Sequence, residues 1–383
     1  MSILPADKPK YQQILEQLKE DIASGKYATG ERLPSESELV KTFDTSRVTV
    51  NRALRELQLS GAIDRRAGSG SYVTATVSKG YTFGLLIPEL GRTEIFEPLC
   101  RGMAEAKDAD HHTLLWGKSL SDSGVEKGEV ESLCRQFISK RVSGVFFAPL
   151  ELTPEKDAIN RDIVETLDRA GIPIVLLDRD LVAYPERSRY DLVGIDNRRA
   201  GYVITEHLIA AGAKKLIFIG RPGSAPTVDA RIAGFREAIM NSADMKFQSE
   251  LVVRIDPWDK KAIQRANDHL HPDGIVCAND FTAAHVMKAL SELGIAVPAE
   301  VRIGAFDDVK YASLLPVPLT TIHQPCNELG TAAIETMVQR LQHAAFPGRD
   351  VALNFRLIVR KSSGVNGETV EPSGVLDLRV PPL

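Results

Sequence analysis

Charged and amide side chains follow several apolar segments in the middle of this 383-residue chain. For example, IVLL directly precedes Asp178, and IGAF directly precedes Asp307. Because the carboxyl ends of parallel strands meet at one edge of a sheet, we expect such residues to share a pocket. Their carboxylates, amides and guanidinium groups suit the hydroxyl groups of a sugar. The residues concerned are Asp178, Arg179, Thr227, Arg231, Asn279 and Asp307.

Each of these residues also has a plainer interpretation. Taken singly, Arg231 could be a surface arginine and Asp307 a helix cap. Their common position after strands favours the shared pocket. The two arginines would also be compatible with a phosphorylated or acidic ligand.

A second group of charged residues lies near the amino terminus. Between residues 45 and 70, five arginines face only Glu56 and Asp64, although the whole chain has a net charge of −4. A local basic patch on an acidic chain indicates a dedicated DNA-binding module rather than a protein that coats nucleic acid. The arginines are Arg47, Arg52, Arg55, Arg65 and Arg66.

Catalytic, metal and membrane signatures are missing from the sequence. It contains no H-E-x-x-H and no G-x-S-x-G, and the RPGS loop at 221–224 lacks the spacing of a phosphate-binding loop. The four cysteines are widely separated, so we expect reduced core thiols, no metal and no cofactor. With no signal peptide and no long apolar run, we expect a cytoplasmic protein that is not an enzyme.

The basic segment lies within a pattern of three helices and a hairpin. Apolar spacing predicts a helix over 8–26, and Ser35 with Glu38 forms a capping box that starts a second helix. A third helix, capped by Thr45 or Ser46, runs to about residue 60. Two short strands at 62–66 and 71–76 flank a glycine-rich tip at 67–70. This order predicts a winged helix-turn-helix.

From residue 81 onward, apolar strands alternate with helical segments. Such alternation predicts parallel sheets with helices on both faces, and the number of strands favours two lobes. The expected strands are 83–87, 112–116, 142–148, 174–177, 192–195, 215–219, 274–277 and 301–305. The expected helices are 98–106, 129–140, 158–170, 198–211, 229–241 and 280–293.

Two families resemble these segments. Residues 30–73 (GERLPSESEL through GSGSYV) resemble the GntR family's DNA-binding domain. Segments such as VGIDNRRAGYVITEHLIAAGAKKLIFIG, starting at Val193, resemble LacI-type sensors, which are related to periplasmic sugar-binding proteins. The combination is similar to the AraR group of sugar-responsive repressors. It implies an α+β winged helix-turn-helix N-terminal domain followed by a two-lobed α/β periplasmic-binding-protein-like (type I) sensor domain.

The expected boundaries follow from these resemblances. Residues 1–74 form the DNA-binding domain, 75–80 a linker, 81–364 the sensor and 365–383 a C-terminal tail. In the sensor, we expect the chain to cross between lobes near 190–196, again near 320–325, and a third time before Leu357.

The first resemblance implies a DNA-reading surface. In a winged helix-turn-helix the third helix enters the major groove with its N-terminal turn leading. Arg47 would contact guanine and Asn51 adenine, whereas hydroxyl groups would meet phosphates. A solvated helix face is the plainer alternative. Ser37 and Asn51 stand where the family often has arginine, so no operator sequence is transferred. The implied DNA-binding residues are Ser46, Arg47, Thr49, Asn51, Arg52, Arg65, Arg66, Gly68 and Gly70.

The second resemblance adds three residues to the expected pocket. The six residues named at the outset match ligand-contacting positions of LacI-type sensors, as do Gln324 in a crossover and Trp258 in a loop. Phe96 matches a position where an aromatic ring often lies against the ligand. A core position is the plainer interpretation of Trp258.

Together these features predict a transcription regulator, most simply a repressor, whose affinity for operator DNA is controlled by a sugar or sugar derivative. A symmetric homodimer would read a palindrome. A sugar receptor without DNA function is the main alternative, and the winged helix argues against it.

Overall fold

A computed structural model describes residues 9–23, 25–59, 62–66, 68–74, 80–87, 94–106, 112–116, 127–242 and 251–365. The expected linker therefore lies outside the described residues except for Gly80, and the expected tail except for Val365. The chain divides into two compact units: the first contains residues 1–81 together with 110–113, and the second contains the rest. Each unit is described by itself.

The first unit is a winged helix-turn-helix, as predicted. Its core forms where the apolar stripes of three amphipathic helices meet, and Ile14, Leu18, Leu39 and Leu54 are buried there. The elements are α1 (Lys10–Ala23), α2 (Glu36–Phe43), α3 (Arg47–Leu59), β1 (Ile63–Arg66) and β2 (Gly70–Val73). The two strands pair antiparallel to form the wing.

Local hydrogen bonds explain where these helices begin. Ser35 and Glu38 form the predicted capping box, with the Ser35 amide donating to the Glu38 carboxylate at 2.7 Å. At the start of α3, the Ser46 hydroxyl accepts from the Thr49 amide at 3.3 Å. Ser46 is therefore the residue that caps the third helix.

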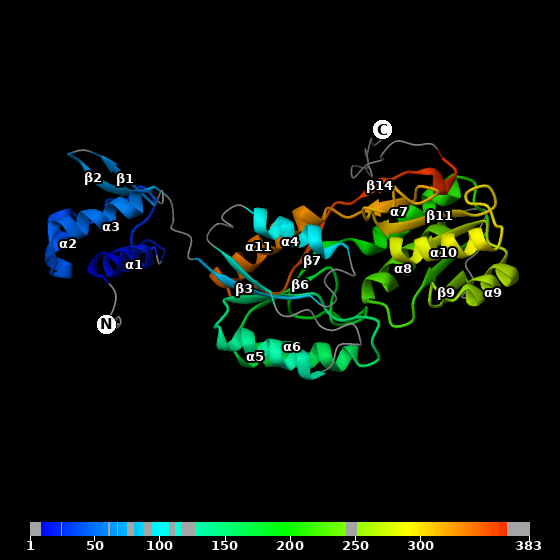
Figure 1. The fold of residues 1–383 in the computed structure, drawn as a ribbon, viewed down its shortest axis with the longest axis horizontal. Coiled ribbons are helices and arrows are strands. Elements are labelled where there is room, and N and C mark those ends of the chain that lie inside the picture. Colours follow the sequence, from blue (N-terminus) through cyan, green and yellow to red (C-terminus); the bar gives the residue numbers. More distant parts are fainter. Residues whose placement is uncertain are drawn as a thin grey trace, which may run out of the picture. The chain divides into compact units, whose positions relative to one another are not determined.

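The second unit contains two lobes, each built on a six-stranded sheet (Figure 1). In the first lobe the strand order is β13-β7-β6-β5-β3-β4. Its strands are β3 (Thr82–Leu86), β4 (Thr113–Trp116), β5 (Gly144–Phe147), β6 (Ile174–Leu177), β7 (Asp191–Ile195) and β13 (Asp350–Leu353). Its helices are α4 (Phe96–Glu105), α5 (Lys127–Ser139), α6 (Lys156–Arg169) and α11 (Cys326–Gln342). Helices α5 and α6 lie on one face of this sheet, and α4 with α11 on the other.

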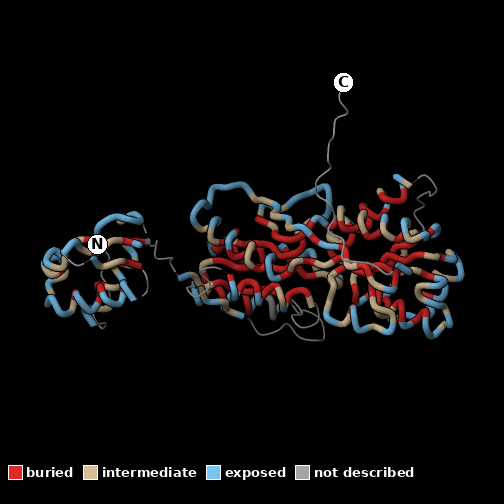
Figure 2. The backbone as a smooth tube through the Cα atoms, turned by 90° about the horizontal axis from the view of Figure 1, so that it is seen from above, coloured by how far each residue is buried: buried red, intermediate tan, exposed pale blue. Residues whose placement is uncertain are grey.

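The second lobe repeats this arrangement with strand order β14-β12-β11-β10-β8-β9. Its strands are β8 (Leu216–Gly220), β9 (Val252–Arg254), β10 (Gly274–Cys277), β11 (Arg302–Asp307), β12 (Thr320–His323) and β14 (Arg356–Ile358). Its helices are α7 (Asn197–Ala210), α8 (Pro226–Asn241), α9 (Lys260–Leu270), α10 (Asp280–Glu292) and the 3₁₀ turn η3 (Lys361–Ser363). Buried residues line the sheets of both lobes (Figure 2).

The chain crosses between the lobes three times, as predicted. It leaves the first lobe after β7 and enters α7, returns from β12 to α11, and crosses finally from β13 to β14. Strands β9, β12, β13 and β14 were not predicted. Strands β9, β13 and β14 are partly exposed at sheet edges, and β12 has the sequence TTIH, so none shows the continuous apolar run that marks a strand buried on both faces.

Glycines allow two helices of the second lobe to pack closely. A Cβ atom on Gly201 of α7 would lie 2.1 Å from the Arg231 carbonyl oxygen, and one on Gly234 of α8 would lie 1.9 Å from that of Arg198. The absence of side chains at both positions lets α8 rest directly on α7. This contact fixes the backbone at Arg231.

The four cysteines are buried and form no disulfide, as expected. No helix within the described residues is both long and apolar enough to cross a membrane.

Candidate functional site

The predicted DNA-contacting residues lie at the N-terminal cap of α3, on α3 itself and on the wing. Ser46, Arg47, Asn51 and Arg52 are exposed, and Thr49 is half-buried. The hydroxyl groups of Ser46 and Thr49 lie 2.8 Å apart. The Ser46 hydroxyl thus caps the helix and is also hydrogen-bonded to the Thr49 hydroxyl.

A single carboxylate joins three of these residues. Glu36, on the first turn of α2, accepts from Arg65 at 2.6 Å, from Arg47 at 3.1 Å and from Asn51 at 3.4 Å. Arg65 also donates to the Asn51 amide oxygen at 3.1 Å. We call Glu36, Arg47, Asn51 and Arg65 the Glu36 network. It links α2, α3 and the wing into one polar surface.

The remaining arginines contact other groups. The Arg52 guanidinium lies 3.8 Å from the centre of the Tyr11 ring on α1, so it packs on the neighbouring helix. Arg66 pairs with Asp64 at 3.1 Å and lies over the Tyr72 ring. These contacts hold both side chains against their own unit.

Glycines shape the tip of the wing. Gly68 and Gly70 have φ angles of +73° and +126°, which disfavour other residues. In addition, a Cβ atom on Gly70 would lie 2.6 Å from the Arg32 side chain. The turn therefore requires both glycines.

In the second unit, predicted residues from both lobes come together. Arg179 of the first lobe is almost fully buried; it donates to the Pro149 carbonyl at 2.7 Å and to Glu151 at 2.6 Å. Its guanidinium also lies 3.6 Å from the carboxylate of Asp178. Among the described residues, one oxygen of Asp178 is buried without a hydrogen-bond partner. An acceptor in that state suits a ligand hydroxyl.

The second lobe contributes Arg231 from α8 and Asp307 from the end of β11. Arg231 is 4% exposed; it donates to Asn197 at 2.8 Å and to the Ala278 carbonyl at 2.6 Å. Its guanidinium lies 3.6 Å from Asp307, which accepts from Gln324 at 2.8 Å. We call Asp178, Arg179, Arg231, Asp307 and Gln324 the interlobe cluster.

Electrostatics couple the two halves of this cluster. Burial raises the pKa of Asp178, while Arg179 and Arg231 act in the opposite direction. Burial also raises the pKa of Asp307 to about 6, against the opposing effects of Arg231 and Gln324. Because Arg231 acts on Asp178 from the other lobe, the charges on the two lobes face each other.

Comparisons with known proteins agree with both units. Residues 10–73 match the model of bacterial regulatory proteins of the gntR family, and residues 205–363 match a periplasmic binding protein-like domain. The chain therefore joins a GntR-type DNA-binding domain to a periplasmic-binding-protein-like domain. It is a transcription regulator.

Several known transcription regulators are similar to this chain. An arabinose metabolism transcriptional repressor from Geobacillus stearothermophilus is 27% identical over 368 residues, covering 93% of this chain and 98% of the relative. A solved complex of the transcriptional regulator CelR with cellobiose has a TM-score of 0.63 at 22% identity. The match covers 83% of this chain and 91% of the CelR chain. The structure of the transcription regulator GntR from Chromobacterium violaceum has a TM-score of 0.58 at 26% identity. The match covers 74% of this chain and 100% of the other. The matched proteins are regulators rather than enzymes, as the sequence predicts.

Four predicted ligand residues of the regulator lie outside the interlobe cluster. Thr227 is half-buried on the first turn of α8, and Asn279 caps α10 by accepting from the Thr282 amide at 2.9 Å. Phe96 is fully buried, with Arg179 5.6 Å from its ring centre. Trp258 is 54% exposed, so the alternative of a core position is wrong. Within the described residues, its ring contacts are with Arg221, Phe281 and His285.

Several residues that shape these two sites were not predicted from the sequence. Glu36, Glu151 and Asn197 each bind predicted site residues, but nothing in their local sequence marks them. Val48 is 80% exposed on the first turn of α3. An apolar residue on the first turn of the expected DNA-reading helix could have been identified from the sequence as a DNA contact, because such a side chain suits a thymine methyl group.

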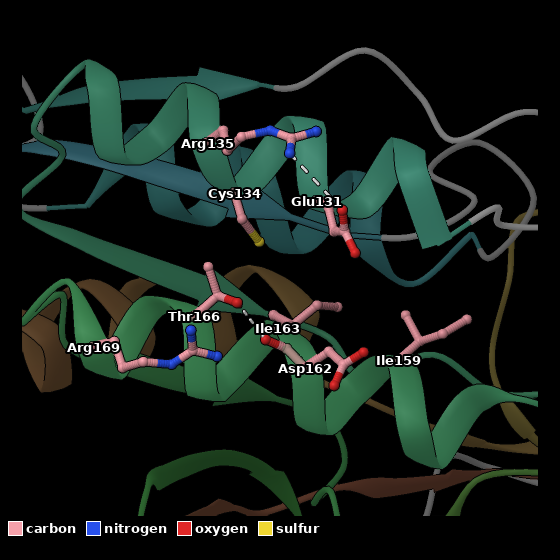
Figure 3. Close-up of a pocket in the computed structure, with 8 residues that line it drawn as sticks. All are labelled: Glu131, Cys134, Arg135, Ile159, Asp162, Ile163, Thr166 and Arg169. Carbon is pink, nitrogen blue, oxygen red and sulfur yellow. Dashed lines mark hydrogen bonds and ion pairs between the residues drawn. The ribbon is translucent and has the colours of Figure 1, made fainter.

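A separate groove of about 350 Å³ lies between α5 and α6 of the regulator (Figure 3). Its lining residues include Glu131, Cys134, Asp162 and Arg169, and none belongs to the interlobe cluster. Among the described residues, no group of three or more His, Cys, Asp or Glu side chains is placed to hold a metal ion.

Proposed function

We propose that this regulator is a repressor whose affinity for operator DNA is set by an uncharged sugar bound at the interlobe cluster. The observation that carries the proposal is the meeting of Asp178 from one lobe with Arg231 and Asp307 from the other. A ligand that contacts both lobes favours one arrangement of the lobes over others, which is the requirement for a population shift.

The charges of the cluster support an uncharged ligand. Arg179 is paired with Glu151 and lies near Asp178, and Arg231 is paired with Asp307. When Glu151 is counted with Asp178 and Asp307, three carboxylates face two guanidinium groups, so a phosphate or carboxylate would enter a site with surplus negative charge. Sugar hydroxyls can donate to the buried carboxylate oxygens at lower electrostatic cost. An uncharged sugar therefore suits these charges better than the phosphorylated or acidic ligand that the two arginines alone would allow.

The relative named as an arabinose metabolism repressor supports a pentose as the first candidate. In the proposed site, Thr227, Asn279, Trp258 and Phe96 also contact the sugar. Trp258 is accessible and could close over the apolar face of a sugar ring. We further propose that the regulator acts in the cytoplasm, where its operator DNA lies.

The DNA-binding part of the proposal rests on α3 and the wing. Arg47, Asn51 and Arg65, which Glu36 holds in the free protein, would contact the duplex together with Ser46, Thr49, Arg52, Arg66, Gly68 and Gly70. One winged helix offers a small contact area, so we propose that a homodimer reads a palindromic site. Light scattering on the protein–operator complex tests this, and a single protomer per operator would refute it.

The decisive experiment combines two measurements. A thermal-shift panel of pentoses, hexoses and their phosphates should show stabilisation by an uncharged sugar, because a ligand that binds only the folded state raises its apparent stability. A gel shift against the regulator's own upstream region should then change with that sugar. Stabilisation by sugar phosphates alone would contradict the proposed ligand class, and specific sugar binding without any specific DNA binding would favour the receptor alternative.

A further inference from the structure

Glu151 connects the interlobe cluster to the opposite lobe. It lies in the first lobe, four residues after β5, and one carboxylate oxygen accepts from Arg179 at 2.6 Å. The other oxygen accepts from the backbone amide of Ala225 in the second lobe at 2.9 Å. One side chain therefore contacts a predicted ligand residue and the other lobe at the same time.

A second hydrogen bond lies beside the first. The Leu152 amide donates to the Gly223 carbonyl at 2.8 Å, again from the first lobe to the second. Leu152 has a φ angle of +60°, a left-handed conformation that is unfavourable for a leucine. Such a conformation persists where surrounding contacts hold it, and here the contact is to the other lobe.

Both ends of this connection are anchored. In the first lobe, the buried side chain of Asn160 holds Leu150 through two hydrogen bonds, of 2.8 Å to its amide and 3.1 Å to its carbonyl. In the second lobe, Ala225 is 2% exposed and directly precedes α8, the helix that carries Arg231. Movement of either lobe would therefore pull on Glu151.

We propose that Glu151 is a positioning residue that holds the two lobes together and couples Arg179 to their closure. We call this pair of contacts the latch. The Glu151 carboxylate that binds the second lobe also orients the Arg179 guanidinium before a sugar binds to it. The coupling to a ligand rests on the function proposed above, whereas the holding of the lobes does not. Loss of the latch should open the ligand-free protein and weaken sugar binding, because fewer molecules would be in the binding-competent arrangement.

Two variants separate the contacts of Glu151. Glu151→Gln keeps the size of the side chain but removes the charge and one acceptor. Ala225→Pro removes the amide donor without changing Glu151 or Arg179, and the φ angle of −64° at Ala225 is one that proline adopts, although the ring adds atoms at a buried position. Glu155→Gln is the matched control, since Glu155 is exposed in the same segment and makes no capping hydrogen bond.

The distance between lobes can be measured without ligand or DNA. Spin labels at Asp157→Cys and Asp229→Cys would report it, because these residues come from different lobes and line one groove of about 330 Å³. The native cysteines are buried and should not be labelled. Circular dichroism confirms folding of each variant.

We expect longer and broader distances for Glu151→Gln and Ala225→Pro, and the wild-type distribution for Glu155→Gln. With L-arabinose as the probe, both latch variants should bind about tenfold or more weakly, the loss expected for a hydrogen bond to a charged group. Wild-type distances in either folded latch variant would overturn the proposal. Wild-type protein that binds no sugar would instead count against the proposed function, because the distance measurement stands by itself.

Discussion

The carboxylate of Glu36 lies 2.6 Å from the guanidinium of Arg65, so an acidic residue of α2 neutralises a cation of the wing. The same carboxylate pairs with Arg47 at 3.1 Å. Two arginines that we expect at the DNA are thus held by one acid in the free protein. Phosphates and base edges must compete with Glu36 for them.

Glu36→Gln should increase binding to DNA of random sequence. Both arginines lose a charged partner, so each is available to a phosphate, and the salt dependence should steepen by up to about 0.9 per added phosphate contact. The measurement is affinity for operator and random duplexes at several salt concentrations. Glu56→Gln is the control, because it makes the same charge change at an exposed position of α3. A Glu36 variant that behaves like this control would show that the network does not restrain the arginines.

Arg47→Ala should cost about 1–3 kcal/mol of operator binding and relax the sequence preference at one position per half-site. The physical reason is that the exposed guanidinium would make two hydrogen bonds to a guanine edge. Binding-site selection with the variant checks this, with Arg55→Ala as an exposed arginine control on the same helix. Equal losses on operator and random DNA would identify Arg47 as a phosphate contact only.

Asp307→Asn should weaken sugar binding about 10- to 100-fold, corresponding to about 1.5–3 kcal/mol for a charge-assisted hydrogen bond. Operator affinity should stay close to that of the wild type, because the substitution is in the second unit and asparagine can still accept from Gln324. Calorimetry with the stabilising sugar and a gel shift on the same preparation measure the two effects. A folded variant with an unchanged midpoint for the sugar response would remove Asp307 from the proposed site.

The pKa of Asp307, raised by burial to about 6, makes a prediction about pH. Between about pH 4 and pH 6 the folded protein binds this proton more readily than the unfolded chain does. The contribution of Asp307 to stability therefore rises as the pH falls through this window and is lost as the pH increases above 6. Asp178 shifts in the same direction. Denaturant titrations at pH 7 and pH 5 should show less acid stabilisation in Asp307→Asn than in the wild type; equal pH dependence would contradict the assignment.

Local patterns in the sequence were sufficient for much of the fold. The capping box of Ser35 and Glu38 and the strands Ile174–Leu177 and Gly274–Cys277 were predicted at their observed positions. A capping box involves residues only three positions apart. A strand buried on both faces is a continuous apolar run. Both features can therefore be recognised from residues that are close in sequence. The three crossings between lobes, by contrast, were expected from the resemblance to LacI-type sensors rather than from local patterns.

Only the tertiary structure decided what surrounds the predicted site residues. Sequence order placed Asp178 and Asp307 at the ends of strands and Arg231 beyond another strand. It could not show that Asn197 and Glu151 bind the arginines of the sensor, or that Glu36 binds Arg47, Arg65 and Asn51. Strand β13 illustrates the same limit, because it pairs with β7, from which it is separated by more than 150 positions. Whether a charged side chain is free or neutralised depends on partners distant in sequence, brought near by packing, and no local pattern records those partners.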